Sequence, residues 1–595
     1  MSSSESSAGL LEKVQTFVAE NRRAVLIGSA AAALAVGGAV YLASTSRPGA
    51  PDVEKAAKKA KKAAKGGKKR KTVKDKDGPI LEERKPKATA EEDAKVYTAE
   101  EIAAMSEEER QKVASSFKAR GNSAYQARQF ATAAELYTRA IEVSPKAEPV
   151  FYSNRAACYI NLSPPKYDEV IADCDEALRL DTKYVKALNR RAMALEAVER
   201  YQEALRDFTA ATILDKFQNQ SAAQSVERVL KKLSALQAAE IMKGREPRLP
   251  SHTFIAAYFA AFRPRPQPTL PEEPTTGDNT LLLAIQATEA ADYIHAVSLV
   301  NEAIEQGISW DTGKAEALNL RGTFKFLMGD IDGAKADLEE SLKLVPSFTQ
   351  SLVKLASVHM EQGDPQSTFE CFERAITFNP SDPDIYYHRG QVLFIMSDFM
   401  EASKNYTKST ELDDQFVFSH IQNAVAEYKV GNIAHSMATF RRTLVAFPQR
   451  SEPHNYYGEL LMDQQRFEDA VEKFDKAFEI EKTKRSPNVL PLVNKGLALY
   501  QWKQDIGAAE RCCREALEID PECEAAVATL AQLSLQQSKI DGAVEMFDRQ
   551  AELARSEPEL TNALTYKYAA LAQSEFAKNY PAMALEMQAM AASMA

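Results

Sequence analysis

The chain has 595 residues, 45% of them hydrophobic and 27% charged, and it carries a formal net charge of −10. That length and that apolar fraction are enough for several packed domains. Its six cysteines include no CxxC pair, and neither they nor the seven histidines are spaced as metal ligands, so we expect reduced thiols, no metal site and no cofactor.

The first predicted element is residues 24–44, a run of 21 positions without a charged residue. As a helix rising 1.5 Å per residue it would extend about 30 Å, the thickness of the hydrocarbon core of a bilayer. We therefore expect a single transmembrane helix behind a short tail, residues 1–23. The alternative is a cleaved secretory signal, whose apolar core is usually only about 7–15 residues long.

A lysine-rich stretch follows the expected span. Between Arg47 and Lys76, thirteen Lys or Arg residues stand against three acidic ones. Positive residues directly after a span stay on the cytosolic side, and their mutual repulsion keeps a tether extended. Few aromatic residues interleave with the lysines, which argues against a nucleic-acid site. We expect residues 45–92 to be a disordered basic linker in the cytosol.

Helical patterning begins near Thr98, where the run from Thr98 to Glu101 has the spacing of a capping box. Two predicted helix-turn-helix repeats follow, at 114–147 and 149–182, and a third begins at Val185. A helical connector after these repeats completes a first block, predicted over 93–245.

A proline-rich connector, 246–274, separates this block from a second one, predicted over 275–595. The second block opens with a degenerate repeat, Gly277 to Trp310. Its last two repeats are expected to start near Leu490 and Glu524, with the final helices capping the array.

The middle of the second block carries a regular repeat of 34 residues. Small residues recur at this interval, and each is followed 16 positions later by a large apolar one: Gly322 and Leu338, Ala356 and Phe372, Gly390 and Tyr406, Ala424 and Phe440, Gly458 and Phe474. A small residue lets two helices approach closely, and the large one fills the space beside it, so each pair needs its neighbours to complete a core. The pattern resembles the tetratricopeptide repeat (TPR). The expected fold is therefore all-α, a TPR helical-repeat solenoid in two blocks behind one transmembrane helix.

Five polar residues recur on the first helices of the first block, which would line the concave face of such a solenoid. They are Lys118, Asn122, Asn154, Lys186 and Arg190. Cationic groups supply charge and amides supply directed donors, a combination suited to the carboxylates of a peptide C-terminus. The alternative for any one of them is a solvated helix face. Their identity and order resemble those of the carboxylate-clamp TPR domains, which implies binding of the acidic EEVD-type tails of the seventy- and ninety-kilodalton heat-shock chaperones.

The corresponding positions of the second block carry different side chains, so we do not expect a second clamp there. They are Tyr387, His388, Glu452 and Asn455. A groove of aromatic and mixed polarity suits apolar or amphipathic segments that are held without strict sequence readout. The alternative is that the tyrosines only pack the repeats together.

In its order of elements the whole chain resembles the seventy-kilodalton receptors of the mitochondrial outer-membrane protein translocase. The resemblance implies a single-pass protein of the mitochondrial outer membrane whose large domain faces the cytosol. It also implies that the first block docks chaperones while the second takes internal targeting segments of preproteins, typically inner-membrane carriers, and that other translocase subunits are partners. An alternative is a membrane-anchored TPR chaperone adaptor on the endoplasmic-reticulum or plastid surface.

A TPR protein with an attached enzyme is a further class to consider. Such a protein would need a separate catalytic stretch, yet repeats and linkers account for nearly all of this chain. The sequence contains no phosphate-binding loop, no GxSxG motif and no paired-cysteine site. We therefore expect no enzymatic activity.

Overall fold

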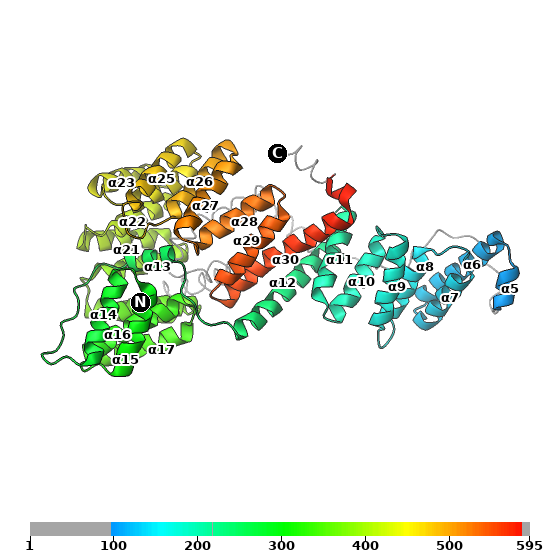
Figure 1. The fold of residues 1–595 in the computed structure, drawn as a ribbon, viewed down its shortest axis with the longest axis horizontal. Coiled ribbons are helices and arrows are strands. Elements are labelled where there is room, and N and C mark those ends of the chain that lie inside the picture. Colours follow the sequence, from blue (N-terminus) through cyan, green and yellow to red (C-terminus); the bar gives the residue numbers. More distant parts are fainter. Residues whose placement is uncertain (1–96, 217, 586–595) are drawn as a thin grey trace, which may run out of the picture. The chain divides into compact units, whose positions relative to one another are not determined.

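The computed structural model describes residues 97–216 and 218–585, and within them the regular secondary structure is helical (Figure 1). These residues form two compact units. The first unit holds residues 97–240 together with 564–585, and the second unit holds 241–563. The division therefore falls inside two helices, α12 (Gln220–Lys243) and α30 (Glu557–Asn579).

The first unit is built from three helix pairs. A short helix, α5 (Ala99–Ala104), precedes them, and its expected capping box is present, because the Thr98 side chain and the Glu101 side chain each accept from the other's backbone N–H. The pairs are α6 (Glu107–Gln126) with α7 (Phe130–Val143), α8 (Pro149–Ile160) with α9 (Tyr167–Leu180), and α10 (Val185–Ala197) with α11 (Tyr201–Leu214).

The second unit contains one short helix, α13 (His252–Ala260), and eight further helix pairs within the described residues. The pairs are α14 (Thr276–Glu289) with α15 (Tyr293–Gln306), α16 (Asp311–Leu327) with α17 (Ile331–Leu344), α18 (Thr349–Glu361) with α19 (Pro365–Phe378), α20 (Pro383–Ile395) with α21 (Phe399–Leu412), α22 (Val417–Val430) with α23 (Ile433–Ala446), α24 (Glu452–Asp463) with α25 (Phe467–Glu481), α26 (Leu490–Lys503) with α27 (Ile506–Ile519), and α28 (Glu524–Gln536) with α29 (Ile540–Leu553).

The close approach predicted from the 34-residue repeat is confirmed. A Cβ added to Gly390 would lie 2.7 Å from the ring of Tyr406, and one on Gly458 would lie 2.6 Å from the ring of Phe474. Both rings are fully buried. Only glycine fits against an aromatic ring at this distance, so the small residue and the ring together set the spacing of the two helices.

Ion pairs also tie first helices to second helices. Arg155 on α8 donates two hydrogen bonds to Asp173 on α9, at 2.9 and 2.6 Å. Arg321 on α16 holds Asp337 on α17 in the same way, at 2.7 and 2.6 Å. Because both aspartates are largely buried, these bidentate pairs fix the register of one helix against the next.

The expected connector contributes to the core of the second unit rather than only separating two blocks. Helix α13 places Phe254, Ile255 and Tyr258 in the same apolar cluster as repeat residues such as Phe324 and Leu338. All three α13 side chains are at most 5% exposed. The run that reads as a linker in the sequence is therefore an internal helix of the solenoid.

Just after α13, Arg263 anchors the connector to the start of α20 and the end of α21 in the second unit. It donates to Asp384 at 2.8 Å and to Asp382 at 2.6 Å, and it lies 3.4 Å from Asp413. Asp384 is 1% exposed and also accepts from the Gln350 side-chain amide at 2.9 Å. The guanidinium thus supplies the charge that this buried carboxylate needs.

The end of the chain differs from the expectation that it would cap the second block. From Leu564 onward it belongs to the first unit. There Phe576 and Tyr580 are buried in an apolar cluster with side chains of α9, α10 and α11. Phe576 on α30 packs on helices that lie far away in the sequence. The repeat pattern does not indicate which distant helices the end of the chain packs against.

Within residues 97–585 no helix combines the length and the apolar character needed to cross a bilayer. The expected span, 24–44, and the expected basic linker, 45–92, lie outside the residues that the structure describes.

Candidate functional site

The five residues of the predicted clamp lie on the first helices of the three pairs in the first unit. Lys118 and Asn122 are one turn apart on α6, Asn154 is on α8, and Lys186 and Arg190 are one turn apart on α10. This placement agrees with the four-residue spacing read from the sequence.

Two of the five, Asn122 and Arg190, hydrogen-bond to buried side chains of the neighbouring helices. The Tyr137 hydroxyl, from α7, donates to Asn122 Oδ1 at 2.6 Å. Arg190 is 2% exposed, and its Nη1 donates to the Ser153 backbone oxygen at 2.8 Å and to the Ser153 hydroxyl. Ser153 directly precedes Asn154, so the guanidinium of α10 is held against the part of α8 that carries the amide.

The charge of Arg190 changes the electrostatics of its neighbours. Burial raises the pKa of the Cys158 thiol to about 12, and the guanidinium opposes that shift. Burial likewise raises the pKa of the Tyr137 hydroxyl, again against the pull of Arg190. These groups stay neutral at physiological pH, so neither adds a negative charge beside the guanidinium.

Asn154 is fully buried, and neither its Oδ1 nor its Nδ2 makes a hydrogen bond within the described residues. The nearby Tyr137 hydroxyl gives its hydrogen bond to Asn122 instead. An unsatisfied buried amide costs about 1–3 kcal/mol and is therefore uncommon outside functional sites. Here it directly follows Ser153, the residue that Arg190 contacts.

Sequence reasoning missed Tyr137 and Ser153. Tyr137 could have been found, because it follows Gly121 by 16 residues. The large apolar residues of the second block follow their small partners at the same interval. A Cβ on Gly121 would lie 2.9 Å from the Tyr137 ring. Ser153 had no comparable signal, since its role depends on a contact with a residue 37 positions away.

Two of the four groove residues predicted in the second block are core residues. Tyr387 is fully buried, and its ring lies edge-on to that of Phe416 at 5.1 Å between centroids. His388 is 2% exposed and stacks on Phe262, just beyond α13, at 4.3 Å. The connector therefore covers the face on which an open surface was expected at His388.

The other two lie in a half-buried polar cluster on α24. Asn455 and Asn494, the latter on α26, each donate from Nδ2 to Glu459 Oε1 at 2.8 Å. Glu452 pairs with Arg450 through two hydrogen bonds, at 2.7 and 2.9 Å. Glu459 and Asn494 were missed by sequence reasoning, although Glu459 stands one helical turn after Asn455.

The environment of Glu459 favours a neutral carboxyl group. Burial raises its pKa to about 7, and the two amide hydrogen bonds oppose that shift. Among the described residues no Lys, Arg or His forms an ion pair with it. A cationic group that pairs with this carboxyl would therefore have no internal cation to displace.

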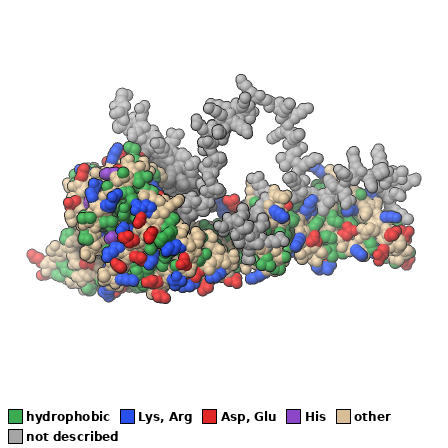
Figure 2. All heavy atoms as spheres, turned by 90° about the horizontal axis from the view of Figure 1, so that it is seen from above, with side chains coloured by type: hydrophobic (Ala, Val, Ile, Leu, Met, Phe, Trp, Pro, Cys, Tyr) green, Lys and Arg blue, Asp and Glu red, His purple; other side chains and the backbone are tan. Residues whose placement is uncertain are grey.

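Charged side chains of both signs are interspersed on the face drawn in Figure 2. Within residues 97–585 there is also no group of three or more His, Cys, Asp or Glu residues placed to hold a metal ion. The face drawn there is therefore not a uniformly charged surface.

Comparison with known proteins agrees with this architecture. Models of the tetratricopeptide repeat match residues 349–382 and 421–481. The crystal structure of yeast Tom70 superposes with a TM-score of 0.50 at 28% identity, covering 80% of this chain and 99% of that one.

Two relatives match this chain over most of their own length and show the family to which it belongs. The chain is 34% identical over 490 residues to the mitochondrial import receptor subunit TOM70 of Homo sapiens, covering 78% of this chain and 80% of that protein. It is 27% identical over 519 residues to the protein of the same name from Saccharomyces cerevisiae, covering 81% and 83%. The chain therefore belongs to the TOM70 family of mitochondrial import receptor subunits.

Proposed function

We propose that the chain is a receptor of the mitochondrial outer membrane with two separate binding surfaces that face the cytosol. The first docks seventy- and ninety-kilodalton heat-shock chaperones through their acidic C-terminal tails. The second accepts hydrophobic preproteins with internal targeting signals, such as inner-membrane carriers, for transfer to other translocase subunits. No catalytic step is part of this function.

The observation that carries the chaperone proposal is the unsatisfied amide of Asn154 beside the Arg190 guanidinium. A carboxylate placed there would accept from the Asn154 Nδ2 and from the guanidinium, so it would satisfy the buried donor. Lys118, one turn from Asn122 on α6, and Lys186, one turn from Arg190 on α10, would add positive charge. A chain-terminal carboxylate next to acidic side chains has this chemistry.

The second surface is proposed on α24 and α26, where Glu452, Asn455, Glu459 and Asn494 lie. Tyr456 is half-buried on the same helix as Glu459. An aromatic wall beside a carboxylate that lacks an internal cation suits a segment that combines apolar residues with a Lys or Arg.

Binding assays on the full-chain variants Arg190→Ala and Glu459→Ala would test whether chaperones and precursors bind at separate surfaces. Arg190→Ala should abolish capture of a chaperone by its tail and leave direct capture of a purified carrier precursor intact, whereas Glu459→Ala should do the reverse. A matched control is Glu411→Ala, which changes an exposed carboxylate on the second helix of a pair. If Arg190→Ala reduced both activities equally, the two surfaces would not be separate.

A further inference from the structure

Helix α10 carries two of the clamp residues, Lys186 and Arg190, and its position therefore decides where their charges lie. Other side chains of this helix, including Ala187 and Leu188, pack into an apolar cluster. The same cluster contains Phe576 and Tyr580, which come from the end of the chain. Both aromatic side chains are at most 9% exposed, and their rings lie 5.0 Å apart.

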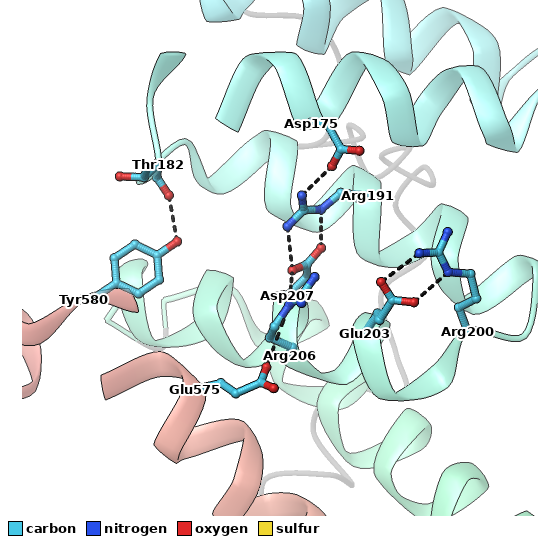
Figure 3. A network of polar contacts seen from close by, with 9 residues as sticks. All are labelled: Asp175, Thr182, Arg191, Arg200, Glu203, Arg206, Asp207, Glu575 and Tyr580. Atoms are coloured by element: carbon cyan, nitrogen blue, oxygen red, sulfur yellow. Dashed lines mark hydrogen bonds and ion pairs between the residues drawn. The ribbon is translucent and has the colours of Figure 1, made fainter. Parts of the chain in front are cut away.

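A hydrogen bond joins the end of the chain to the loop that begins α10. The Tyr580 hydroxyl donates to the backbone oxygen of Thr182 at 2.7 Å (Figure 3). Thr182 lies three residues before α10, whose first turn holds Lys186. The contact thus fixes the backbone at the point where the chain enters the clamp helix.

A chain of ion pairs lies beside this contact. Arg191, the residue after Arg190, donates to Asp207 on α11 at 2.6 and 2.9 Å. Arg206 approaches Asp207 at 3.3 Å and Glu575 on α30 at 3.9 Å (Figure 3). The last pair is long and partly exposed, so it adds little. The apolar contact and the Tyr580 hydrogen bond are the stronger ties.

From these contacts we propose that Phe576 and Tyr580 are positioning residues of the clamp, which hold α10 where Lys186 and Arg190 can reach a peptide carboxylate. The proposal rests on the proposed chaperone-tail function of that site. It makes residues 576–580 part of the machinery that positions the clamp in the first unit.

Titration of the full chain with an EEVD-ended peptide, in its free-acid and amidated forms, tests the proposal. Phe576→Ala should weaken binding of the free-acid peptide roughly ten-fold, because small displacements of binding groups lose affinity, while Phe576→Leu retains it. Tyr580→Phe should act in the same direction with a smaller loss. Binding of the amidated peptide should change little, and amide hydrogen exchange in residues 182–191 should become faster.

Lys578→Ala is the matched control, since Lys578 is exposed on the same helix, and it should change neither measurement. If Phe576→Ala prevents folding, the peptide affinity and amide exchange of Tyr580→Phe test the positioning role instead. Unchanged affinity and exchange in Tyr580→Phe, or an equal loss for the two peptide forms, would overturn the positioning role. The variant Arg190→Ala separates this outcome from a failure of the clamp itself: were it to bind the free-acid peptide normally, the proposed function would be wrong.

Discussion

Gly390 on α20 and Tyr406 on α21 are in such close contact that a Cβ on the glycine would lie 2.7 Å from the tyrosine ring. The same relationship recurs at Gly121 with Tyr137 and at Gly458 with Phe474. The position of the ring therefore depends on the absence of a side chain on the neighbouring helix, and this makes the repeat directly testable.

Gly390→Ala should destabilise the second unit, because the added methyl group overpacks a filled core at a cost of about 1–3 kcal/mol. Alanine would gain about 1 kcal/mol of helix propensity, which is smaller than the upper part of that cost. Urea denaturation followed by circular dichroism measures the difference. Gly542→Ala is the control, since its Cβ would meet only the Ser534 hydroxyl at 3.7 Å, and we expect it to be neutral or stabilising.

Arg263→Ala should cost about 3–5 kcal/mol, because it leaves the buried Asp384 carboxylate without its cation. Adding Asp384→Asn in the same chain should recover part of the loss, since the uncompensated charge is then removed. A double-mutant cycle in urea provides the measurement. The change Arg265→Ala, at a more exposed ion pair with Glu316, should cost less; an equal cost at both sites would contradict the role given to Arg263.

Lys354 provides a prediction of pH dependence. Burial lowers its pKa to about 7, below its usual value in an unfolded chain, so between these two pKa values the unfolded state binds more protons. Stability should therefore rise with pH from about 7 to about 10, by up to about 1.4 kcal/mol per pH unit. Lys354→Met should flatten this rise, whereas Lys408→Met, at an exposed position, should leave it unchanged. Identical slopes in all three proteins would show that Lys354 is charged in the folded state.

The positive residues after the expected span predict the orientation of the chain in its membrane. We expect residues 47–595 in the cytosol and the short N-terminus on the other side. Protease added to intact mitochondria should then remove the large domain. Protection of that domain until the outer membrane is ruptured would rule out the receptor orientation.

The repeat could be predicted from sequence because its determinants are close together in the chain. Gly458 and Phe474 are 16 residues apart, and the two helices that carry them are joined by a tight turn. Each helix pair therefore carries its own packing signal. The positions of the five clamp residues on α6, α8 and α10 followed from the same periodicity.

What the sequence did not predict depends on contacts between distant segments. Tyr580 donates a hydrogen bond to Thr182, which is 398 residues away in the chain. Phe262 stacks on His388, which is more than a hundred residues away. A periodic pattern describes the face of a helix but not which distant segment packs on it. For this reason Tyr387 and His388 were expected in an open groove, and the end of the chain was assigned to the second block.

We propose that the first unit recognises the carboxylate at the end of a chaperone tail. Calorimetric titration of the full chain with an EEVD-ended peptide should give clear binding that Arg190→Ala weakens by about 2–5 kcal/mol. Arg190→Lys should not restore it, because lysine lacks the bidentate geometry of a guanidinium. Amidation of the peptide's C-terminus should weaken binding to the wild-type chain in the same way. Equal affinity of the wild-type chain for the free-acid and amidated peptides, or equal affinity of the wild-type and Arg190→Ala chains for the free acid, would contradict the claim.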